Sequence, residues 1–65
     1  MMRLIKCVEG AEYTAKVYRN YHWDEYVVKY YKNGKYLGEG PTYYTDAKDD
    51  ALHTASYQVM RFESK

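Results

Sequence analysis

Asn33-Gly34 lies between two runs of strand-forming residues, and it constrains the fold more than any other feature of the chain. A type I′ turn needs positive φ at both central positions, which asparagine and glycine tolerate best. Glu25–Lys32 is rich in aromatic and β-branched residues, and Lys35–Glu39 continues after the turn. The two-residue loop fixes the pairing, with Tyr31 opposite Tyr36. The sequence therefore predicts an antiparallel hairpin of known register.

Hydrophobic periodicity predicts the remaining elements. An apolar segment with two charges indicates a strand over Met2–Val8, and a period-two pattern indicates another over Glu12–Arg19. The strand after the Asn-Gly turn is interrupted at Pro41, which lacks a ladder donor, and it resumes over 42–44. The period then changes, and apolar residues at helical spacing predict a helix over 46–62. The fold class is α+β: a three-stranded or four-stranded antiparallel sheet packed against one C-terminal helix, β-β-β-α, as a single domain over residues 1–65.

The register of the first hairpin depends on its loop. A four-residue loop pairs Arg19 with Asp24. A shift of two residues would place Lys16 opposite Lys29, and like charges directly opposite each other destabilise a sheet. The sequence therefore favours the pairing of Arg19 with Asp24.

These registers divide the strand residues between two faces. The face expected to pack on the helix carries Tyr13, Ala15, Val17, Tyr26, Val28, Tyr30 and Leu37. The opposite face carries Thr14, Lys16, Tyr18, Val27, Lys29, Tyr31 and Tyr36.

Composition narrows the sources of stability. A 65-residue chain buries only about 60% of the surface its unfolded form exposes, so it needs efficient packing or self-association. Cys7 is the only cysteine, which excludes an intrachain disulfide, and we expect it to be a small core residue. The two histidines lack a cysteine set at zinc spacing, so neither a metal nor a cofactor is expected. Ten tyrosines against one phenylalanine indicate many half-buried rings with solvated hydroxyls.

Catalysis and membrane insertion receive no support from the sequence. No catalytic spacing of Ser, His, Cys and Asp is present, and a chain this short has little room for a pocket that excludes water. We therefore expect a protein that is not an enzyme. The apolar runs are too short for a membrane span or a signal peptide. A lone thiol without an export signal predicts a cytoplasmic location.

Binding is the remaining class of function, and the face opposite the helix is the predicted site. Open sheets bind nucleic acid by stacking bases on aromatic rings while lysines hold phosphates. Tyrosine is also a frequent anchor at protein interfaces, so the alternatives are a protein partner, such as a host protein that this chain inhibits, and a homodimer. A further alternative is that Tyr31 and Tyr36 only stabilise the sheet. Trp23, in the first turn, could anchor a partner, although covering the core is its expected role. The candidate binding residues are Lys16, Tyr18, Lys29, Tyr31, Tyr36 and Trp23.

The stretch from Tyr26 through Asn33-Gly34-Lys35 to Thr45 and Ala51 resembles the arm-type DNA-binding domain of phage integrases. That resemblance implies three strands and a helix, with the sheet entering the major groove. The same stretch is similar to the second half of a double-stranded RNA-binding domain, but acidic residues over 45–50 replace that family's lysine cluster. Size and aromatic content also resemble small uncharacterised bacteriophage proteins, which implies a phage accessory protein that binds nucleic acid or a host protein.

Overall fold

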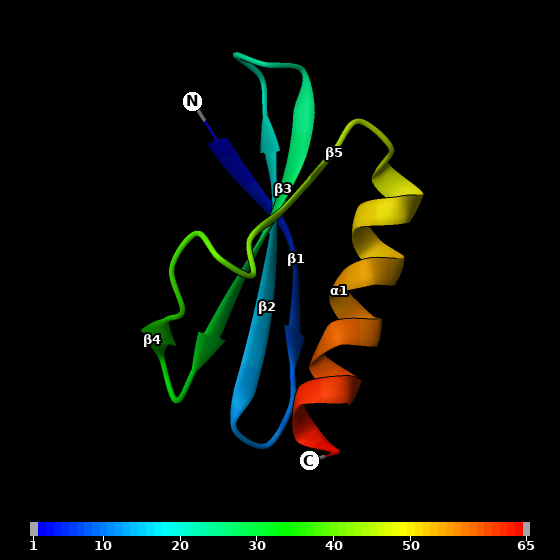
Figure 1. Ribbon diagram of the computed structural model, residues 1–65. Coiled ribbons are helices and arrows are strands. Elements are labelled where there is room, and N and C mark those ends of the chain that lie inside the picture. Colours follow the sequence, from blue (N-terminus) through cyan, green and yellow to red (C-terminus); the bar gives the residue numbers. More distant parts are fainter. Residues whose placement is uncertain (1, 65) are drawn as a thin grey trace.

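The computed structural model describes residues 2–64 of the chain and contains an antiparallel sheet covered on one side by a single helix (Figure 1). The elements in order are β1 (Met2–Glu9), β2 (Tyr13–Asn20), β3 (Glu25–Lys32), β4 (Lys35–Tyr36), β5 (Tyr43–Thr45) and α1 (Lys48–Glu63). The α+β class and the order of strands before helix are as predicted. Within the described residues, no helix is long and apolar enough to cross a membrane.

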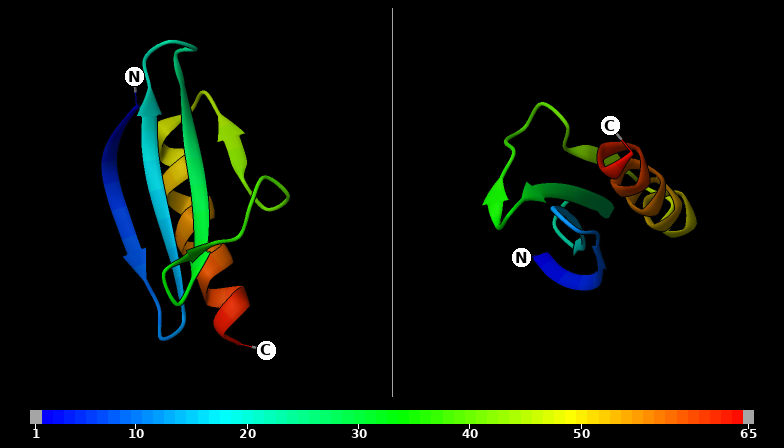
Figure 2. Two further views of the ribbon diagram at one scale, coloured as in Figure 1. Left: turned by 90° about the vertical axis from the view of Figure 1, so that its left-hand side faces the viewer. Right: turned by 90° about the horizontal axis from the view of Figure 1, so that it is seen from below.

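The strands lie in the order β1-β2-β3-β4, and β5 also pairs with β3. β4 and β5 pair with different residues of β3 along the same edge, so together they form one interrupted edge strand (Figure 2). The residues between them, 37–42, include Pro41 and leave the sheet. This interruption is the one that the Gly-Pro sequence predicts. β1 supplies the fourth strand at the opposite edge.

The Asn-Gly hairpin has the predicted register. Tyr31 lies opposite Tyr36, and Asn33 and Gly34 have φ values of 52° and 83°. Both values lie in the left-handed region that a type I′ turn requires.

The predicted register of the first hairpin is wrong by two residues. The four-residue loop begins one residue later than expected, so Asn20 pairs with Glu25 and Lys16 lies opposite Lys29. Like-charge repulsion does not prevent this pairing, because both ammonium groups lie over tyrosine rings on a solvated face. A shift of two residues preserves side-chain alternation, so the division into two faces is unchanged.

The core lies between α1 and the helix-facing side of β2 and β3. Its buried residues are Ala15, Val17, Val28, Tyr30, Ala51, Ala55 and Val59. The helix alanines leave room for the Tyr30 ring, which packs edge-on against Phe62 with centroids 5.5 Å apart. Tyr13 stacks on the same phenylalanine at 4.8 Å, and Tyr26 packs against the core while half-buried.

Leu37 is the exception among the predicted core residues. It is 37% exposed and is not among the residues packed against the core, although its N–H still donates to the Tyr30 carbonyl at 2.9 Å just after β4 ends. The N-terminal helix boundary also differs from the prediction. The N-cap is Ala47, whose N–H donates to the Thr45 hydroxyl, so the threonine acts just ahead of the helix.

The C-terminal end of α1 is fixed to the turn between β1 and β2. Glu63 accepts hydrogen bonds from the backbone N–H groups of Tyr13 and Glu12, each at 2.7 Å. These bonds favour the charged carboxylate and hold the pKa of Glu63 below its usual value. Gly10 belongs to this contact, because a Cβ at that position would lie 2.6 Å from Glu63 Oε2.

Candidate functional site

The sheet surface turned away from α1 is the candidate site, and we call it the Tyr/Lys face. It is defined by Lys16 and Tyr18 on β2, Lys29 and Tyr31 on β3, and Tyr36 on β4. The left view of Figure 2 looks onto this side, with the helix behind the sheet. The structure therefore brings together five of the six predicted site residues on a surface that the helix leaves open.

The two lysines lie among the tyrosine rings. The Lys16 ammonium lies 4.9 Å from the Tyr31 centroid. Lys29 lies 5.6 Å from the centroids of both Tyr18 and Tyr36, so one ammonium group is flanked by two rings. Side-chain alternation puts all five residues on the same side of the strands, and the pairing of Lys16 with Lys29 brings both charges to its centre. The face is thus a cluster of cations and aromatic surfaces.

Tyr31 and Tyr36 form a cross-strand aromatic pair. Their centroids are 5.5 Å apart and the rings are tilted by 46°, within the range of favourable aromatic contacts. Burial, followed by the neighbouring Tyr18 hydroxyl, raises the pKa of Tyr31, while Lys16 and Lys29 act in the opposite direction. Tyr31 is therefore neutral at pH 7.

One residue assigned to this face is not available for binding. Val27 is only 2% exposed, because it lies between Tyr18 on β2 and Tyr44 on β5. Tyr44 is itself 49% exposed and belongs to the same side of the sheet, although the sequence prediction omitted it. The register of β5 depends on the length of the 37–42 loop, which local periodicity does not reveal.

An acidic residue of that loop borders the Tyr/Lys face. Glu39 accepts a hydrogen bond from the Tyr44 hydroxyl at 2.6 Å and another from the Tyr36 hydroxyl at 3.2 Å. The bond to Glu39 is the main reason that the pKa of Tyr44 rises to about 12. The Tyr36 oxygen also lies 3.0 Å from the Thr42 hydroxyl, which donates to the Gly38 carbonyl. These bonds hold the loop against the edge of the face and put a carboxylate at its border.

Trp23, the sixth predicted residue, lies apart from the other five. It is 70% exposed at the tip of the β2–β3 hairpin, so the expectation that it covers the core is wrong. Its ring makes an edge-on contact with His22 at 4.9 Å. Asn20 accepts a hydrogen bond from the His22 N–H, and Arg19 forms an ion pair with Asp24. The tip is therefore braced by local contacts, while its tryptophan faces solvent.

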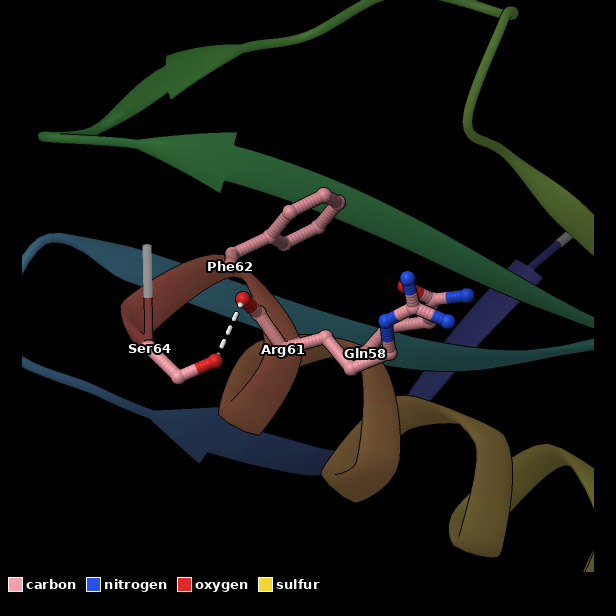
Figure 3. A pocket seen from close by; sticks show the side chains of 4 residues that line it. All are labelled: Gln58, Arg61, Phe62 and Ser64. Atoms are coloured by element: carbon pink, nitrogen blue, oxygen red, sulfur yellow. Dashed lines mark hydrogen bonds between the residues drawn. The ribbon is translucent and has the colours of Figure 1, made fainter.

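Other locations have weaker claims to function. An open pocket at the C-terminal end of α1 is lined by Gln58, Arg61, Phe62 and Ser64 (Figure 3). Its only aromatic member, Phe62, is committed to packing on Tyr13 and Tyr30. Cys7, expected in the core, is exposed on the edge strand β1. Among residues 2–64, no group of three or more His, Cys, Asp or Glu side chains could hold a metal ion.

Comparison of the chain with protein-family models, with curated proteins and with solved structures found no match. The resemblances to phage proteins and to integrase arm-binding domains therefore remain predictions from the sequence.

Proposed function

We propose that this chain is a small non-catalytic protein that binds nucleic acid through the Tyr/Lys face. The observation that carries the proposal is the position of two ammonium groups, Lys16 and Lys29, among three tyrosine rings on a side of the sheet without a covering helix. Ammonium groups bind phosphates, and exposed rings offer stacking surfaces to bases. The net charge of only +1 means that the attraction comes from the local cluster and not from the whole surface.

The test is a titration of labelled oligonucleotides at two or more salt concentrations. Each lysine that neutralises a phosphate of a single strand contributes about 0.7 to the slope of log affinity against log salt. The variant Lys16→Gln/Lys29→Gln should bind more weakly, and its slope should fall by about 1.4. Lys6→Gln/Lys48→Gln is a matched control, because it removes the same charge from exposed positions on β1 and α1. Failure of the wild-type protein to bind any oligonucleotide at low salt would exclude the proposal.

The hairpin tip favours a second candidate, a protein partner. Trp23 is 70% exposed and Tyr21 is 56% exposed, and tryptophan and tyrosine are the residues most enriched at interface hot spots. Arg19, whose guanidinium lies 5.3 Å from the Tyr21 centroid, helps to hold the tip in place. A partner of this kind should lose affinity with Trp23→Ala and keep it with Lys16→Gln/Lys29→Gln. The fluorescence of Trp23, the only tryptophan, would report its burial directly.

A further inference from the structure

We infer that the nucleic acid bound by the Tyr/Lys face is single-stranded and is recognised with little regard to base sequence. This inference rests on the proposed function and specifies its ligand. The shared chemistry is a chain of phosphates carrying unpaired bases, which single-stranded DNA and single-stranded RNA both supply.

The first argument is the form of the site. The Lys16 ammonium lies over the Tyr31 ring, 4.9 Å from its centroid. A base that stacks on this ring displaces the ammonium group sideways, where it stays within reach of the phosphate of the same nucleotide. Lys29 repeats this arrangement with Tyr18 on one side and Tyr36 on the other. Bases within a duplex are stacked on each other and cannot place their faces on these rings, whereas unpaired bases can.

The second argument is the breadth of the surface. A major groove about 12 Å wide admits a helix or a two-stranded ribbon. The ribbon that carries the lysines is formed by β2 and β3, but β1 lies along one side of it, and β4 and β5 lie along the other. Beside Lys29 the outer edge is interrupted, because β4 pairs with Tyr31 and Lys32 and β5 with residues 26–28. At that level β1, β2 and β3 at a spacing of about 4.8 Å span roughly 10 Å before their side chains are counted. The side chains of these strands add to that width, so β1 on one side and the ends of β4 and β5 on the other restrict how far Lys16 and Lys29 can enter the groove.

The third argument is the set of side chains on the face. Base edges in a duplex are read chiefly by Arg, Lys, Asn and Gln, through hydrogen bonds in the grooves. The Tyr/Lys face has no Arg, Asn or Gln among its defining residues, and its two lysines lie over tyrosine rings. The hydroxyls of Tyr36 and Tyr44 are engaged with Glu39. The rings remain available for stacking, which tolerates any base. The Glu39 carboxylate repels phosphate, so the backbone of the strand should run along the lysines, away from the 37–42 loop.

The experiment measures fluorescence anisotropy of labelled oligonucleotides with the full chain at low salt. The arms are oligothymidylate, a mixed-sequence DNA strand, the RNA strand of the same sequence and the corresponding DNA duplex. We expect both DNA strands to bind with affinities within about threefold of each other, and at least about tenfold more tightly than the duplex. Comparison of the RNA strand with the DNA strand of the same sequence shows whether single-stranded RNA or single-stranded DNA binds more tightly. Equal or tighter binding of the duplex would overturn the inference and leave the proposed function standing, whereas absence of binding in all arms would overturn both.

Ring variants test the stacking step. Tyr36→Thr should weaken single-strand binding roughly 5- to 150-fold, the loss expected for one stacked base. Tyr36→Phe keeps the ring and removes the hydroxyl, so it should bind like the wild type; an equal loss in both variants would refute stacking. Tyr57→Ala is the matched control, because Tyr57 is 49% exposed on α1 with the Arg61 guanidinium 5.8 Å from its centroid. Circular dichroism establishes that each variant is folded, and the half-buried Tyr31 is left unchanged for that reason.

Discussion

Replacing Tyr30 by phenylalanine should stabilise the protein. The Tyr30 side chain is 1% exposed, and its hydroxyl has no hydrogen-bond partner among the described residues. A buried polar group without a partner costs roughly 1–3 kcal/mol. Tyr30→Phe removes that cost and retains the edge-on ring contact with Phe62. The lost oxygen also gives up a few dispersion contacts, each about 0.1–0.2 kcal/mol. The net gain should be about 1 kcal/mol, or a rise of about 4–8 °C in Tm.

Urea and thermal unfolding followed by circular dichroism measure this difference. Val17→Ala is the control for the sensitivity of the same core: Val17 is fully buried, and losing two methyl groups should cost about 2–3 kcal/mol. Destabilisation of Tyr30→Phe by 1 kcal/mol or more would refute the reasoning, because it would mean that the hydroxyl is hydrogen-bonded through water.

The pH dependence of the same variant gives an independent check. Burial raises the pKa of Tyr30 to about 12, because the folded state disfavours the phenolate. A pKa raised by folding contributes stability that is present below the unfolded pKa, near 10, and is lost as the pH rises toward 12. The stability gap between Tyr30→Phe and the wild type should therefore widen between about pH 10 and pH 12.

Three further substitutions have defined outcomes. Gly10→Ala should displace the Glu63 carboxylate and lower Tm. In the wild type, the stability that comes from the depressed pKa of Glu63 is lost as the pH falls through that pKa, and the variant should lack this contribution. Urea midpoints of both proteins at neutral and acidic pH measure the difference. Gly34→Ala forces a side chain to adopt φ 83° and should cost about 1–2 kcal/mol in chemical unfolding; a neutral result would mean that the turn has changed type. Glu39→Gln should shift the pKa of Tyr44 from about 12 back toward its ordinary value in an alkaline ultraviolet titration, and an unchanged titration would contradict the hydrogen bond between them.

Local sequence patterns determined the element types and the division of the tyrosines. Asn33-Gly34 specified a turn that only residues tolerant of positive φ can form, and this fixed the pairing of Tyr31 with Tyr36. Side-chain alternation then assigned residues to faces, and that assignment survived the error in the first register because the error was two residues. The helix followed from spacing alone, since Ala51 and Ala55 recur on one side of it.

Only the tertiary structure determined the register of the first hairpin and which side chains are buried. The register of the first hairpin depends on contacts across the sheet, where the rings beside Lys16 and Lys29 offset a repulsion that a pairwise rule treats as decisive. The burial of Val27 requires Tyr44, which reaches it only because β5 returns to β3 after the 37–42 loop. Leu37 and Trp23 are exposed, also for reasons that lie in the tertiary structure. Their apolar character predicts burial, but Leu37 follows the end of β4 outside the core, and Trp23 lies in the loop beyond the ends of β2 and β3. Short-range pattern sets which side of a strand a residue occupies, and only the packing of distant segments sets whether that side is covered.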